Sequence, residues 1–180
     1  MGYIHPGLGL WRRTLIDALR RTCANLQAPA AFIDQTLCTW NTDNGLVENM
    51  TTVEGLRFMQ EEFAAVQPDI VLAGEGCNEI SFQRECFAQA HIFNTPHVGG
   101  LTPDHVAMSV PICSFLWRSH TQLLGYYHLH PNDVDMDLGI EVYRNLGVMP
   151  TLGPGHFTKE EDPLADPRVL RVLEQAKSWR

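Results

Sequence analysis

The chain has 180 residues, of which 44% are hydrophobic and 19% charged, as in a folded globular domain rather than a disordered segment. Thirteen Lys and Arg against 21 Asp and Glu give a net charge of −8 without a basic stripe, so neither nucleic acid nor a membrane surface is an expected partner. The five cysteines form no CxxC pair, no apolar run is long enough to span a membrane, and no signal peptide is visible. We therefore expect a cytoplasmic protein.

The elements expected in the first half of the chain alternate between helix and strand. Apolar residues at spacings of three and four indicate helices, a Thr followed by Glu three residues later is a helix-capping box, and a short continuous apolar run indicates a buried strand. These signals predict a helix over 8–26, a strand over 29–34, a loop over 38–45, a helix from Thr51 to Pro68, and a strand over 69–74. The first helix is expected to bury Leu10, Trp11, Leu15, Leu19, Cys23 and Leu26.

The second half of the chain gives weaker signals of the same kind. They favour a helix over 81–90, strands over 91–94 and 110–117, a strand end or loop over 126–130, a helix over 135–146, a strand over 147–152, and a final helix opened by Asp162 and Pro163. That last helix is expected to bury Leu164, Val169, Leu170, Leu173 and Ala176. Helices alternating with short apolar strands predict an α/β fold with parallel strands, in a single domain over residues 1–180.

Two carboxylates come at the ends of two expected strands, Asp34 in the first and Glu75 in the second. The carboxyl ends of parallel strands build the active sites of TIM barrels. Two carboxylates in one cleft can cleave a glycosidic bond: one attacks or stabilises the oxocarbenium-like centre, and the other protonates the leaving oxygen. An acid after a strand also serves as a helix N-cap or as the partner of an arginine, so this interpretation competes with a structural one.

Aromatic and polar side chains elsewhere in the chain suit a carbohydrate ligand. Trp40 and Trp117 can stack on a pyranose face, and Asn78 can bond its hydroxyl groups. His97 and His128 are further candidates for lining the cleft. Tryptophans also pack in protein cores, and isolated histidines also occur in loops, so each of these residues has a second, purely structural interpretation.

The segments AAFIDQT and DIVLAGEGCNE, preceded by IHPGLGLWRRTLIDALRRTC, resemble the catalytic half of glycoside hydrolase (β/α)8 barrels. The α-amylase-like and endo-α-N-acetylgalactosaminidase-like barrels, and bacterial families related to them, are the most similar in character. The resemblance covers residues 4–80. It implies that Asp34, ending the fourth strand, is the nucleophile and Glu75, ending the fifth, the general acid/base, with retention of anomeric configuration.

The same resemblance implies only part of a TIM-type barrel, about strands 3 to 8, because a whole barrel typically needs roughly 200–250 residues or more. A partial barrel leaves sheet edges uncovered, so we expect either a missing N-terminal half or self-association.

Two other functions fit parts of the sequence. His128 and His130 form an HxH pair that, with nearby acids, resembles the metal site of a metal-dependent TIM-barrel hydrolase. A non-catalytic carbohydrate-binding remnant of a barrel is the third hypothesis. Cys77 is also a candidate nucleophile, although no base for it can be identified from the sequence. No GxGxxG or Walker pattern occurs, so a nucleotide cofactor is not expected, and the glycosidase hypothesis requires no cofactor or metal.

Overall fold

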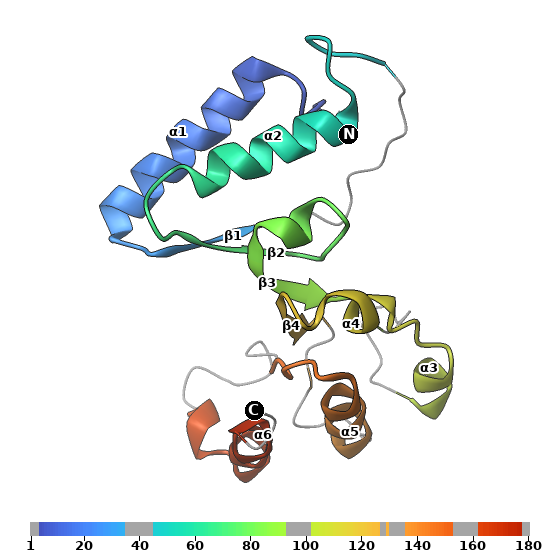
Figure 1. Cartoon of the computed structure of the whole chain (residues 1–180). Helices are drawn as coiled ribbons and strands as arrows, with labels where there is room; N and C mark the ends of the chain where they lie inside the picture. The colour runs from blue at the N-terminus through green and yellow to red at the C-terminus, as the bar shows by residue number, and fades with distance from the viewer. Residues whose placement is uncertain are drawn as a thin grey trace. The chain divides into compact units, whose positions relative to one another are not determined.

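The computed structural model describes residues 4–34, 45–92, 102–126, 129, 136–152 and 162–177. The fold is α/β, with a parallel sheet of four strands in the order β1-β2-β3-β4 (Figure 1). The predicted fold class is therefore confirmed at this level. The chain divides into two compact units, Met1–Ala88 and Gln89–Arg180, with the boundary inside β3.

The helices and strands follow one another in an order close to the predicted one. In chain order they are α1 (Gly9–Leu26), β1 (Ala30–Ile33), α2 (Thr52–Ala64), β2 (Val71–Gly74), the short 3-10 helix η2 (Ser81–Gln83), β3 (Glu85–Ala90), α3 (Pro103–Ala107), α4 (Ile112–Trp117), β4 (Gln122–Gly125), α5 (Met136–Leu146), the 3-10 helix η4 (Pro163–Ala165) and α6 (Pro167–Lys177). The predictions of α1, β1, α2, β2, α5 and a C-terminal helix are confirmed.

Several predicted elements are wrong, and strand pairing or packing with other parts of the chain explains most of these differences. Residues 81–90 form η2 and β3 rather than a helix, because β3 pairs with β2 in parallel register. Residues 112–117 form a helix rather than a strand, and Pro111 is its N-cap, a position where a missing backbone N–H costs little. Strand β4 was not predicted, and the strand expected over 147–152 consists of isolated bridges at Met149 and Leu152. Residues 38–44 and 93–94 lie outside the described residues.

The core of the first unit lies between the two long helices and one face of the sheet. Ile16 of α1, Phe63 of α2 and Leu72 of β2 form its centre, and Ala31 and Ile33 of β1 pack against them. Figure 1 shows α1 and α2 side by side over the same side of β1 and β2. Both helices of this unit thus cover a single face of its strands.

Helix α1 does not bury all the residues expected of it. Leu10 and Leu26 are exposed, whereas Ile16, Cys23 and the polar Arg12 are buried. At 100° per residue, Leu10 and Leu26 lie about 120° and 80° around the helix from Ile16, so they leave the buried face.

Helix α2 begins with the predicted capping box. The Thr51 hydroxyl accepts a hydrogen bond from the Glu54 backbone N–H at 3.2 Å, and the Glu54 carboxylate accepts one from the Thr51 backbone N–H at 2.8 Å. The backbone and hydroxyl bonds from Thr51 hold the pKa of the Glu54 carboxyl below its ordinary value.

A group with a lowered pKa in the folded state stabilises the fold above its unfolded pKa and loses that contribution as the pH falls through the folded value. Glu54→Gln removes the ionisation and leaves a side chain that can still cap the helix. Urea unfolding should find this variant less stable than the parent protein at pH 7, with the difference shrinking as the pH falls through the lowered pKa of Glu54 in the folded state. A difference independent of pH would contradict an ionised cap.

The core of the second unit surrounds β4 and α5. Leu123, Ile140, Tyr143 and Val148 are buried there, and the Tyr143 ring packs against Gly125, where no side chain would fit. On α6, Val169 and Val172 are buried. These two valines set the buried face of α6, so Leu170 and Leu173 lie off it and are exposed. Leu164, also expected to be buried, lies before α6 in η4 and is exposed as well.

Candidate functional site

The backbones of the two candidate acids lie next to each other at the carboxyl ends of neighbouring parallel strands. Ile33 of β1 is paired with Gly74 of β2, and the Glu75 backbone N–H donates to the Ile33 carbonyl oxygen at 3.3 Å. Asp34 and Glu75 are the next residues on each strand. Neighbouring strands lie about 4.8 Å apart, so the backbones of the two acids are separated by about one strand spacing.

Strand alternation also places both acids on the same face of the sheet. Ile33 belongs to the face that packs on the helices, and Gly74 shares that face because it is paired with Ile33. Successive side chains of a strand point to opposite faces of the sheet. Asp34 and Glu75, each one residue further along its strand, therefore belong to the opposite face. Asp34 is exposed and Glu75 is half-buried, so Asp34 is the more accessible of the two to solvent.

An aromatic row lies on this face, just before the acids. Phe32 is paired with Ala73, and Ala73 is paired with Phe87 of β3. Phe32 is 51% exposed and Phe87 39% exposed, with the small Ala73 between them. Phe32 comes two residues before Asp34, about 6–7 Å along the strand. We call Phe32, Ala73 and Phe87 the phenylalanine row.

The segment after Glu75 is anchored on the helix side of the sheet. Cys77 Sγ donates to Glu85 Oε2 at 4.0 Å, and Gln60 Nε2 of α2 donates to Glu85 Oε1 at 3.2 Å. All three side chains are buried, Glu85 to 2% exposure. The Cys77 thiol is only 2% exposed and therefore out of reach of a substrate, which disfavours the nucleophilic role considered for it.

Asn78, a candidate for sugar binding, closes the turn before β3. Its side-chain oxygen accepts hydrogen bonds from the backbone N–H groups of Ile80 and Ser81 at 2.9 and 3.0 Å. Its own backbone N–H donates to the Ser81 hydroxyl at 3.1 Å. This side-chain oxygen therefore has a structural role in shaping the segment that follows Glu75.

The second unit has its own aromatic pair at strand ends. His91 directly follows β3 and Tyr126 directly follows β4, and their rings stack with centroids 3.6 Å apart and planes 24° apart. The stacking of these two rings could not be predicted from the sequence, because 81–90 was expected to be a helix and β4 was not predicted. Trp117 ends α4 in this unit and is half-buried. Trp40, His97, His128 and His130 lie outside the described residues.

The part of the chain that the structure describes offers neither a cluster of metal ligands nor a membrane-spanning helix. No group of three or more His, Cys, Asp and Glu side chains gathers there as metal ligands would. None of the helices described is both long and apolar enough to cross a membrane. Comparison with protein-family models, with curated proteins and with solved structures finds no match to this chain.

Proposed function

We propose that this chain is part of a glycoside hydrolase that cleaves an O-glycosidic bond with retention of configuration. The observation that carries the proposal is the adjacency of Asp34 and Glu75 at the ends of paired strands. Retaining glycosidases hold their two carboxyl groups about 5–5.5 Å apart, whereas inverting enzymes separate them by about 6.5–9.5 Å. The backbones of Asp34 and Glu75 lie about one strand spacing apart, about 4.8 Å, so side chains on the same face can bring their carboxyl groups to the retaining separation.

In this mechanism, a carboxylate oxygen of Asp34 attacks the anomeric carbon while the bond from that carbon to the leaving oxygen breaks. Glu75 gives its proton to the leaving oxygen, and a glycosyl ester of Asp34 remains. Glu75, now ionised, then takes a proton from a water molecule that attacks the same carbon. The ester bond breaks, Asp34 is released as a carboxylate, and the two inversions together give retention.

The topology supports a barrel as the setting of this site. The strands run β1-β2-β3-β4 without reversal, as in a singly wound barrel wall, whereas a doubly wound sheet reverses its order at a switch point. In the first unit both helices cover one face, which corresponds to the outside of a barrel. We therefore propose a (β/α)8 barrel, about strands 3 to 8. In a regular barrel an α-helix follows each strand, whereas here the segment between β2 and β3 contains only the short 3-10 helix η2.

The phenylalanine row supports a carbohydrate as the substrate. On a barrel wall the face away from the helices points inward, so Phe32, Ala73 and Phe87 would form the floor beneath the two acids. Aromatic rings offer a flat apolar surface, which suits the C–H face of a pyranose. The small Ala73 between two larger rings leaves room for a sugar ring to settle over it.

The direct test is to incubate the full chain with a panel of aryl glycosides and follow the first sugar product by proton NMR, before it mutarotates. We expect hydrolysis of at least one member with the anomeric configuration retained. A product of inverted configuration would contradict Asp34 as a nucleophile, because inversion requires direct attack by water. Absence of hydrolysis across all sugars and both anomers would contradict the glycosidase function itself.

A further inference from the structure

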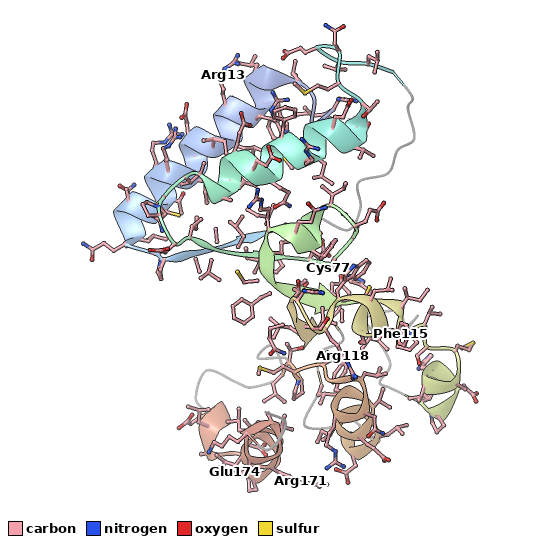
Figure 2. The ribbon with its side chains drawn as sticks, viewed as in Figure 1. Arg13, Cys77, Phe115, Arg118, Arg171 and Glu174 are labelled. Carbon is pink, nitrogen blue, oxygen red and sulfur yellow. The ribbon has the colours of Figure 1, made fainter. Side chains whose placement is uncertain are left out.

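A strip of exposed apolar side chains runs along α4 and the segment before it in the second unit. The strip consists of Met108, Val110, Ile112, Phe115 and Leu116, each more than half exposed. Phe115 is 88% exposed, the largest exposed fraction among the large hydrophobic residues of the described chain. Figure 2 shows Phe115 on α4 together with Arg118, which follows the helix. We call these five side chains the α4 strip.

The strip is the outward face of an amphipathic helix rather than a set of scattered residues. Ile112, Phe115 and Leu116 have the spacing i, i+3, i+4, so they share one side of α4. Ser114, on the other side, is buried, and Trp117 is half-buried. The helix thus packs by its opposite face and presents Ile112, Phe115 and Leu116 to solvent.

The area of the strip matches half of a small protein interface. At these exposures the five side chains offer roughly 500 Å² of apolar surface, given about 200 Å² for a phenylalanine. The largest apolar patch on a typical monomer is about 300–600 Å², and patches of this size are often functional. Two such strips placed face to face would remove about 1,000 Å² from water, the lower limit for a specific interface.

We propose that the α4 strip is the contact surface of a homodimer, in which a second copy of the chain presents the same strip across a two-fold axis. Such an interface is self-complementary, since each residue meets its partner in the reverse order. None of the five side chains is charged, so two strips can meet face to face without burying an unpaired charge. The proposal is independent of the glycosidase function.

Sedimentation velocity of the full chain over roughly 1–200 µM tests the proposal, because an interface of this size supports micromolar association. We expect a saturable monomer–dimer equilibrium. Phe115→Glu should raise the dissociation constant by at least about 30-fold, since a central aromatic residue is a binding hot spot. Leu10→Glu is the matched control, because Leu10 is 64% exposed on α1 and the substitution adds the same charge elsewhere.

Leu116→Glu provides a second test, because Leu116 lies on the same side of α4 as Ile112 and is 51% exposed. This variant should also weaken the dimer. The proposal fails if the parent chain is monomeric at all concentrations. It also fails if the sedimentation coefficient keeps rising with concentration and does not level off at the value of a dimer. It also fails if Phe115→Glu leaves the dimer intact, or if Leu10→Glu disperses it equally. Circular dichroism of each variant checks that the fold is unchanged.

Discussion

Glu75→Gln is expected to lower kcat/KM by about 10²–10⁴-fold on glycosides with poor leaving groups, because it removes the proton donor. The loss should shrink on aryl glycosides whose leaving phenolate needs no proton. Asp34→Asn removes the nucleophile, so turnover should fall to the background for every leaving group. Steady-state kinetics with two leaving groups of different pKa separates the two roles.

Matched controls for these variants come from acids of the same unit. Glu79→Gln repeats the substitution four residues after Glu75, at an exposed position, and should leave turnover unchanged. Asp69→Asn repeats the other substitution at an exposed residue with φ of 61°, a conformation that Asn tolerates well. If Glu75→Gln were as active as Glu79→Gln on poor leaving groups, Glu75 would have no part in the chemistry.

Gly55→Ala is expected to destabilise the protein by at least about 2 kcal/mol, although alanine favours helices by about 1 kcal/mol over glycine. A Cβ atom at Gly55, in α2, would lie 2.6 Å from the carbonyl carbon of Pro6 and 2.8 Å from Cα of Gly7, and closer still to the Gly7 nitrogen. These are backbone atoms, so no side-chain rotation relieves the overlap.

The segment that crosses Gly55 is also held in place from two sides. Arg12 Nη1 donates to the carbonyl oxygens of Pro6 and Gly7 at 2.9 and 2.7 Å, and Arg12 itself is buried. His5 Nδ1 accepts from the Gly7 N–H at 2.9 Å, and its Nε2 lies 3.1 Å from the Thr52 hydroxyl. Moving the segment away from a new methyl group would break these bonds.

Gly9→Ala is the control for this substitution, because it makes the same change at the start of α1. A Cβ atom there meets only the ends of flexible side chains, Glu48 Oε2 at 2.8 Å and Arg13 Nη1 at 3.1 Å. Urea unfolding should show a large loss of stability for Gly55→Ala and little change for Gly9→Ala. Equal stability of the two variants would contradict the close packing of α2 against residues 6–7.

The positions of Asp34 and Glu75 at strand ends could be predicted from the sequence because they depend on local patterns. A continuous apolar run before Glu75 and a short one before Asp34 are sufficient to place strand ends, and the capping box at Thr51 places the helix between them. Pairing of the two strands then follows from the parallel α/β pattern. These signals need no knowledge of distant contacts.

Strand β3, the phenylalanine row and the α4 strip could not be predicted from the sequence, because they depend on tertiary contacts. Residues 85–90, ECFAQA, contain good helix formers, and pairing with β2 overrides that preference. Phe87 was therefore not seen as part of the phenylalanine row. Phe32 was visible two residues before Asp34, but its significance depends on the helices covering the other face. The α4 strip could not be predicted, because a strand and not a helix was expected over 110–117.

The most direct test of the two-carboxylate site is azide rescue of Glu75→Ala on an aryl glycoside with a good leaving group. The glycosyl ester of Asp34 should still form without the acid, and azide, which needs no general base, should then release it. The proposal predicts that azide restores turnover and yields a glycosyl azide of retained configuration, with no such product from Asp34→Asn. A Glu75→Ala variant that hydrolyses the substrate as fast as the parent protein, with or without azide, would contradict the proposed site.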